Sequence, residues 1–264
     1  MPAAKHALLH TLAALVVPGL SALLIPTTAT AADCTARITA AHYDAPTTRY
    51  PHGVLGDEIE HGQLTVTTTV SGDCAEKTPK LTAVLPAELV FEDTAPRLWD
   101  IDGDALPEVV TVESSQTQGA RLTVWSLQNG ELARLTSTPF IGQPFRWLAP
   151  VGAADLDGDG HIEIAYIDRP HLLKTLRVWR FRDGQLHPVD ALPGLANHRI
   201  GERTISSSLQ YCEGRPTLLT PNGNRSRVMA TTLQDNKLRS RDLGPWTSAA
   251  DVLSPRLCEG IDKQ

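Results

Sequence analysis

The sequence has little of what several functional classes require. Lysine and arginine number 24 against 30 aspartates and glutamates, a formal net charge of −6. Nucleic-acid binding needs a basic surface, so we expect no nucleic-acid partner. No Gly-x-Ser-x-Gly motif of a serine hydrolase occurs, and the histidines beyond residue 31 show no His-x-x-x-His zinc spacing. The interpretation therefore leans against an enzyme.

Long apolar runs are also scarce, and the single one, residues 7–25, lies at the N-terminus. Residues 29–31 (Ala-Thr-Ala) follow it and fit a small-x-small cleavage site. We predict a signal peptide over residues 1–31 and an exported protein, periplasmic or secreted, monomeric and without a membrane span after cleavage. An uncleaved anchor is the alternative, because about 20 apolar residues can cross a bilayer. His10 and Pro18 inside the run favour cleavage.

No convincing amphipathic helix follows residue 32, but the chain repeats. Acidic segments begin at Asp44, Asp100 and Asp155, with spacings of 56 and 55 residues, and Trp125 and Trp179 are 54 apart. A single domain of residues 32–264 thus divides into repeat units of approximately residues 36–93, 94–148, 149–200 and 201–250.

Each unit consists of short strand-like runs separated by turn residues. In the third unit, "EIAYID", "TLRVWRF" and "QLHPVDAL" follow one another, with Arg-Asp-Gly as a turn before the last. Such runs, rich in Val, Ile, Leu and Trp, predict antiparallel strands. We therefore expect an all-β fold, a small β-propeller of about four, at most five, four-stranded antiparallel blades.

The third unit carries a dense acidic loop. Oxygen ligands are expected at its positions 1, 3, 5, 7 and 9, with a backbone carbonyl at position 7: Asp155, Asp157, Asp159, His161 and Glu163. Oxygen ligands at this density are typical of Ca²⁺. Position 12 is Tyr166, which excludes an EF-hand. A solvated acidic turn without a metal is the alternative.

The second unit keeps the same ligand positions, again with a carbonyl at position 7: Asp100, Asp102, Asp104, Leu106 and Glu108. Ala105 stands here in place of the glycine at position 6 of the third-unit loop. A left-handed turn costs a non-glycine residue on the order of 1 kcal/mol. We therefore expect weaker calcium binding in this loop.

Residues 151–168 ("VGAADLDGDGHIEIAYID") and 98–114 ("LWDIDGDALPEVVTVES") resemble the FG-GAP or VCBS-type repeat of integrin-α-like β-propellers, in an exported bacterial form. The resemblance implies that the loop between the first two strands of each blade binds calcium through these acids. It also implies that the loops after the second strands, and the connections between blades, lie together on the opposite face.

On that opposite face we expect a candidate ligand site with basic, aromatic and polar side chains: Arg146, Trp147, Asp168, Arg169, His171, Asn197, His198 and Arg199. Arg49, Tyr50 and His52 of the first unit fit the same face less clearly. Three interpretations stay open. The side chains pair and seal the fold, they bind an anion, sugar or peptide end, or His171 or His198 acts as a general base.

We therefore predict an exported calcium-binding β-propeller that serves as a binding or scaffolding module. Its partner would be a carbohydrate, an anionic small molecule or an extracytoplasmic protein. The alternative is a propeller enzyme, a hydrolase or lyase that acts on a carbohydrate or anionic substrate at the Arg/His-rich face.

The four cysteines predict two disulfides in an oxidising compartment. The outer units hold two cysteines each and lack a complete acidic loop, whereas the middle units have loops and no cysteine. This pattern favours the pairs Cys34–Cys74 and Cys212–Cys258. The competing scheme is a clasp of the chain ends, Cys34–Cys258, which leaves Cys74 to pair with Cys212.

Overall fold

The computed structural model describes residues 35–72 and 80–254, together with the isolated Met1. This part of the chain forms sixteen β-strands and one four-residue helix, α1 (Ala250–Leu253). The paired strands are antiparallel, which confirms the predicted all-β class. No helix in these two ranges has the length and apolar character to cross a bilayer.

The first sheet has eight strands from the first two repeat units. They are β1 (Thr35–Thr47), β2 (Glu60–Ser71), β3 (Lys80–Val84), β4 (Leu89–Phe91), β5 (Arg97–Trp99), β6 (Glu108–Ser115), β7 (Gly119–Gln128) and β8 (Glu131–Ser137). The order is β1-β2-β4-β6-β7-β8, with β3 paired to β2 and β5 paired to β6.

The other two sheets have four strands each, in consecutive order along the chain. The second sheet consists of β9 (Leu148–Ala154), β10 (Glu163–Asp168), β11 (Thr175–Arg182) and β12 (Gln185–Pro193). The third sheet consists of β13 (Ser208–Cys212), β14 (Arg215–Pro221), β15 (Arg227–Gln234) and β16 (Lys237–Pro245).

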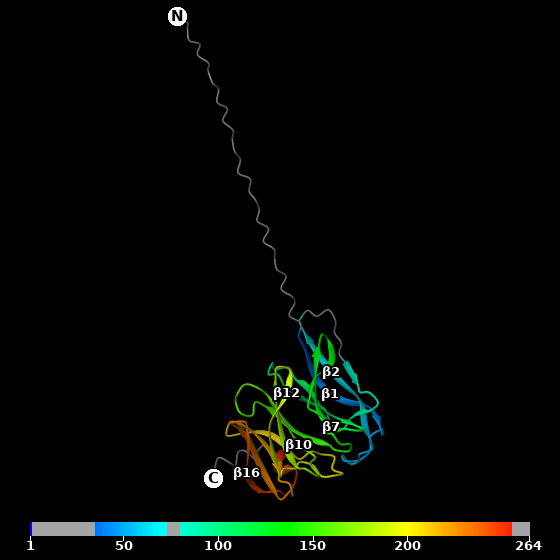
Figure 1. Ribbon diagram of the computed structural model, residues 1–264, viewed down its shortest axis with the longest axis vertical. Coiled ribbons are helices and arrows are strands. Elements are labelled where there is room, and N and C mark those ends of the chain that lie inside the picture. Colours follow the sequence, from blue (N-terminus) through cyan, green and yellow to red (C-terminus); the bar gives the residue numbers. More distant parts are fainter. Residues whose placement is uncertain (2–34, 73–79, 255–264) are drawn as a thin grey trace.

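The first unit does not form a four-stranded sheet of its own. Strand β4 pairs with β2 through His61 and Phe91 and with β6 from Leu89 to Phe91, so it joins the first two units into one sheet. Closure of the sheets into a ring is not detected in the described part of the chain. In Figure 1, β1 and β2 lie toward one end of the folded body and β16 toward the other.

The central strands are the most deeply buried. Every residue of β6 and β10 is buried, whereas the outer strands β12 and β16 are mostly exposed. Val, Ile and Leu in the central strands fill apolar clusters between successive sheets, because a strand covered on both faces is apolar along its whole length. Gly152 of β9 permits close stacking, since a Cβ there would lie 2.6 Å from the Cβ of Leu209.

The buried strands separate two faces of the molecule. Glu108 and Glu163 begin β6 and β10 on the side of the acidic loops, and Ser115 and Asp168 end these strands on the other side. On that second side the first unit reaches the connection between the third and fourth units. The Gly201 amide donates to the Val54 carbonyl at 3.0 Å. Residues far apart in sequence therefore meet there.

Candidate metal centre and basic face

The third-unit loop is folded around the carboxylate of its first aspartate. Asp155 accepts hydrogen bonds from the backbone amides of Gly158 at 2.7 Å and Gly160 at 3.0 Å. Glu163, at the start of β10, accepts one from the Leu156 amide at 2.8 Å. These bonds hold the acids of the loop on one side of a tight turn.

The second-unit loop has the equivalents of these three backbone bonds. Asp100 accepts from the amides of Gly103 at 2.7 Å and Ala105 at 3.0 Å, and Glu108 accepts from the Ile101 amide at 2.8 Å. Ala105 adopts the left-handed conformation with a φ of 67°. The alanine therefore follows the turn that the sequence predicts, at the conformational cost expected of a non-glycine residue.

Each loop gathers three carboxylates whose oxygens lie within 4.8 Å of one another. The two groups are Asp100, Asp102 and Glu108, and Asp155, Asp157 and Glu163. Asp104 and Asp159 stand outside these groups. The amides of Leu106 and His161 donate to Asp104 and Asp159 at 2.7 and 2.9 Å, while their carbonyls remain predicted ligands. Such oxygen clusters are compatible with a metal ion such as Ca²⁺.

The second-unit cluster pairs with no basic side chain in residues 35–72 and 80–254. Among the described residues, no ion pair involves Asp100, Asp102 or Glu108. Glu108 is only 6% exposed, and burial together with the charges of Asp102, Asp104 and Asp100 raises its pKa to about 7. Burial is the main cause of this shift, and the neighbouring aspartates add to it because like charges disfavour ionisation.

The third-unit cluster is already paired with a cation of the chain itself. Arg180 of β11 donates from Nε to Glu163 Oε1 at 2.5 Å and from Nη2 to Asp157 Oδ2 at 2.5 Å. Its Nη1 lies 3.0 Å from Asp159 Oδ2. Burial raises the pKa of Glu163, and the bond from Arg180 opposes that shift.

Sequence reasoning missed Arg180, although a signal was present in the repeat. Trp179 is followed by Arg180, whereas the equivalent Trp125 is followed by Ser126. The pairing confirms the equivalence, because Ile164 pairs with Trp179 as Val109 pairs with Trp125. The residue after this tryptophan on the neighbouring strand is therefore one difference between the two units, and it is the one that meets the acids of the third-unit loop.

On the opposite face, the histidines of the third unit and the following connection meet. His171 Nε2 and His198 Nδ1 are 2.9 Å apart, and His198 Nε2 lies 2.7 Å from the Glu202 carbonyl oxygen. The Trp147 ring stacks on His171 and makes an edge contact with His198. Burial and the neighbouring His198, His52 and Lys174 lower the pKa of His171 to about 4. This imidazole is therefore neutral at pH 7.

Two adjoining cavities open around His171, and we call their walls the basic face. One, of about 330 Å³, is lined by Pro170, His171, Lys174, Ala196, His198, Arg199, Ile200, Gly223, Asn224 and Arg225. The other, of about 210 Å³, is lined by His52, Phe145, Arg146, Trp147, Arg169, His171, Leu172 and Ile200. These lining residues include four arginines and one lysine but no aspartate or glutamate.

The first unit also contributes to the basic face, which the sequence indicated only weakly. His52 Nδ1 lies 2.5 Å from Glu92 Oε1, and the Glu92 side chain is fully buried. Tyr50 stacks on Phe145, and its hydroxyl accepts a hydrogen bond from the Phe145 amide at 2.9 Å. The segment around His52 is thereby fixed against the connection that precedes β9.

Two of the predicted face residues are buried and line neither cavity. Asp168 is 3% exposed and is paired with Arg169 and with Arg177 of β11. Asn197 is fully buried, and its amide nitrogen donates to the Ala149 carbonyl at 3.2 Å. Both carboxylate oxygens of Asp168 are bound by arginines, whereas the side-chain oxygen of Asn197 is buried and has no hydrogen-bond partner among the described residues.

The remaining predicted residues line the cavities, namely Arg146, Trp147, Arg169, His171, His198 and Arg199. Trp147 is nearly buried and donates from its indole nitrogen to the Glu92 carbonyl at 2.8 Å. The topology thus brings together side chains from three connections. Whether they bind a ligand remains a prediction.

Cys212 is the one cysteine among the described residues. It is buried and is not a free thiol. Cys34, Cys74 and Cys258 lie outside the described residues, as does the predicted signal peptide, so the disulfide pairing stays a prediction.

Comparison with known proteins identifies an FG-GAP-like repeat over residues 100–166. This segment contains both acidic loops. No curated protein matches the chain. Among solved structures, the exotype rhamnogalacturonan lyase YesX matches with 13% identity and a TM-score of 0.36, over 82% of this chain and 50% of the lyase chain. The chain therefore spans half the length of that lyase.

Proposed function

We propose that this chain, which carries an FG-GAP-like repeat, is an exported calcium-binding β-propeller that binds an anionic ligand outside the cytoplasm. The observation that carries the ligand proposal is the basic face. Arginine, lysine and histidine line its two cavities on a protein whose net charge is −6, and no carboxylate is among the lining residues. Arg169 and Arg225 pair with Asp168 and Glu202 outside the lining, which leaves Arg146, Arg199 and Lys174 without an ion pair among the described residues. Guanidinium groups bind carboxylate, sulfate or phosphate oxygens through charge-assisted hydrogen bonds.

Calcium is proposed as the structural cofactor of the acidic loops. Asp100, Asp102 and Glu108 would hold it in the second unit, with Asp104 and the Leu106 carbonyl as further oxygen donors. The buried Glu108 and the uncompensated charge around it support this assignment. The ion would neutralise that charge and fix the loop at the start of β6.

The ligand proposal is tested by titrating the purified protein with an anionic saccharide, a free sulfate salt and an acidic peptide. A neutral saccharide serves as the control. We expect binding of at least one anionic probe that weakens as salt rises, because salt screens exposed charge pairs. Arg199→Ala should weaken it, while Arg215→Ala, an exposed arginine on β14, should not. Equal binding of neutral and anionic saccharides would contradict the proposal.

A second candidate function is a hydrolase or lyase at the same face. The observation in its favour is the pair of His52 and Glu92, since a buried carboxylate can orient an imidazole whose other nitrogen serves as a base. His52 lines one of the two cavities beside Arg146 and Arg169. Product formation from an anionic polysaccharide that His52→Gln abolishes would favour this function.

We also propose that the protein is a monomer of the periplasm or medium with the disulfides Cys34–Cys74 and Cys212–Cys258. The burial of Cys212 supports a bonded rather than a reactive thiol. Mapping of peptides without reduction decides the pairing. A peptide that links Cys34 to Cys258 would replace this scheme with the end-to-end clasp.

A further inference from the structure

The third-unit loop contains a positive charge where a metal ion would be expected. All three nitrogens of the Arg180 guanidinium face its acids, on Glu163, Asp157 and Asp159. The Arg180 side chain is 15% exposed, and the Glu163 side chain is fully buried. A planar guanidinium in this position occupies the oxygen atoms that a calcium ion would need.

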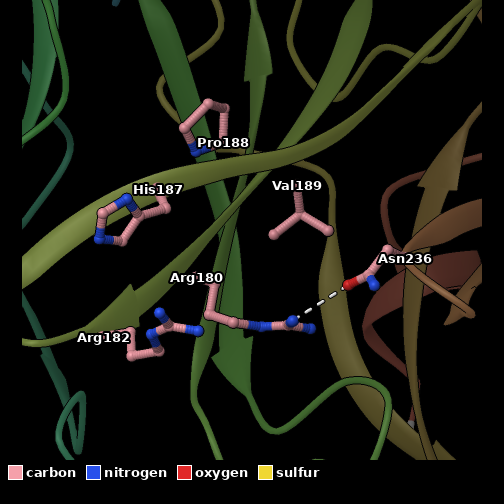
Figure 2. Close-up of a pocket in the computed structure, with 6 residues that line it drawn as sticks. All are labelled: Arg180, Arg182, His187, Pro188, Val189 and Asn236. Atoms are coloured by element: carbon pink, nitrogen blue, oxygen red, sulfur yellow. Dashed lines mark hydrogen bonds between the residues drawn. The ribbon is translucent and has the colours of Figure 1, made fainter.

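Arg180 is also held from the neighbouring sheet. Its Nη1 donates to Asn236 Oδ1 at 3.0 Å, and Asn236 lies in the turn between β15 and β16. Figure 2 shows the Arg180 side chain extended toward Asn236, while Arg182 of the same strand lies apart from this contact. The arginine therefore connects the acidic loop of the third unit with the fourth unit.

A calcium ion could enter this loop only after Arg180 has moved, because the two cations would compete for the same oxygens and repel each other. A cavity of about 320 Å³ lies beside the arginine and would receive the displaced side chain. Asp157 Oδ1 is buried and has no hydrogen-bond partner, so one oxygen of the loop remains for a metal ion. Displacement must also break the bonds to Glu163 and Asn236.

We propose that Arg180 is a built-in competitor of calcium in the third-unit loop, so that the chain binds one Ca²⁺ tightly, in the second-unit loop, and a second ion only weakly. This inference rests on the calcium-binding part of the proposed function. The sequence alone predicts weaker calcium binding in the second-unit loop, because Ala105 stands there in place of Gly160. The proposal reverses this order of calcium affinity. The residue that decides metal affinity lies outside the loop, on strand β11.

The test is a reciprocal exchange between the two repeats. Arg180→Ser gives the third unit the residue of the second, and Ser126→Arg gives the second unit the residue of the third. Titration calorimetry with Ca²⁺, and Tb³⁺ luminescence with competing Ca²⁺, count the sites on the full mature chain. We expect one tight site in the wild type and two sites in Arg180→Ser, with the affinity of the second raised about tenfold or more.

Ser126→Arg should weaken the tight site by about tenfold or more, and it keeps the proposal testable if Arg180→Ser does not fold. Arg182→Ser is the matched control, because Arg182 lies two residues further on the same strand and its side chain is 60% exposed. Two equally tight sites in the wild type, unchanged in Arg180→Ser, would overturn the role of Arg180 but leave calcium binding intact. Absence of binding in all variants would overturn both proposals.

Discussion

The second-unit and third-unit loops have the same backbone turn but a different electrostatic environment. In both, the first aspartate accepts the backbone amides three and five residues further on, and the buried glutamate accepts one amide. The second-unit cluster faces no basic side chain among the described residues, whereas Arg180 pairs with the third-unit cluster. The comparison teaches that the spacing of the acids within a loop specifies the backbone turn. It does not specify whether an arginine of the chain pairs with those acids.

The difference arises on the neighbouring strand. Arg180 stands opposite Glu163 in the register between β10 and β11, and Ser126 follows Trp125 at the equivalent place. Under the proposal made above, this residue outside the motif decides whether the acids are neutralised from within the chain or by an ion from solution. The following four experiments test this contrast.

Removal of calcium should have the largest effect, and the second-unit loop should account for it. An ion that binds only the folded state at about 100 times its Kd stabilises by about 2.7 kcal/mol. For a chain of this size that corresponds to a Tm change of about 5–10 °C. Thermal unfolding with Ca²⁺ and with chelator should show this shift in the wild type and in Asp157→Asn, but not in Asp102→Asn. A shift lost only in Asp157→Asn would contradict the comparison.

Arg180→Ala should lower stability most clearly without calcium. The substitution leaves buried Glu163 and Asp157 without their cation, and we expect a loss of about 2 kcal/mol. The expected loss of stability is smaller than for a fully buried ion pair, because the guanidinium retains some exposure to solvent. Urea unfolding in chelator measures it. Saturating Ca²⁺ should recover part of the loss, and the control Arg182→Ala should change little. Equal loss in both variants would show that the ion pairs do not matter.

Exchange at position 6 of each loop should have a smaller effect. Ala105→Gly removes the strain of the left-handed conformation, and Gly160→Ala introduces it. No atom lies near the Cβ that Gly160 would gain, so the change is a backbone effect. We expect a gain of about 1 kcal/mol for the first and a loss of about 1 kcal/mol for the second. Urea unfolding measures both. A loss of stability in Ala105→Gly, or a gain in Gly160→Ala, would contradict the common backbone turn.

Asn236→Ala should have the smallest effect. It removes one exposed hydrogen bond to Arg180 and leaves the bonds to the acids, and alanine adds a small backbone cost because Asn236 has a left-handed φ of 57°, so we expect a loss of about 0.5–1 kcal/mol in chelator. The same substitution should make Arg180 easier to displace and raise Ca²⁺ affinity at the third-unit loop. Calorimetry measures that affinity. Weaker calcium binding in this variant would contradict the proposed competition.

Much of the fold could be predicted from the repeat pattern. Runs of Val, Ile and Leu between Gly and Asp predicted the strands, and the spacing of the acidic loops placed Glu108 and Glu163 at the starts of buried strands. It did not predict that β4 would join the first two units into one sheet. Short strands of three residues form where neighbouring strands offer them backbone partners, and sequence alone does not contain that information.

The sequence by itself predicted the antiparallel all-β class, the clustering of acids in two loops and the gathering of Arg169, His171 and His198 near one another. These features depend on local pattern and on a regular repeat. The tertiary structure decided that Arg180 meets Glu163, 17 residues away, and that His52 meets Glu92, 40 residues away. Strand register and sheet stacking set such long-range pairs. The role of a charged side chain therefore depends on which residues the fold places next to it.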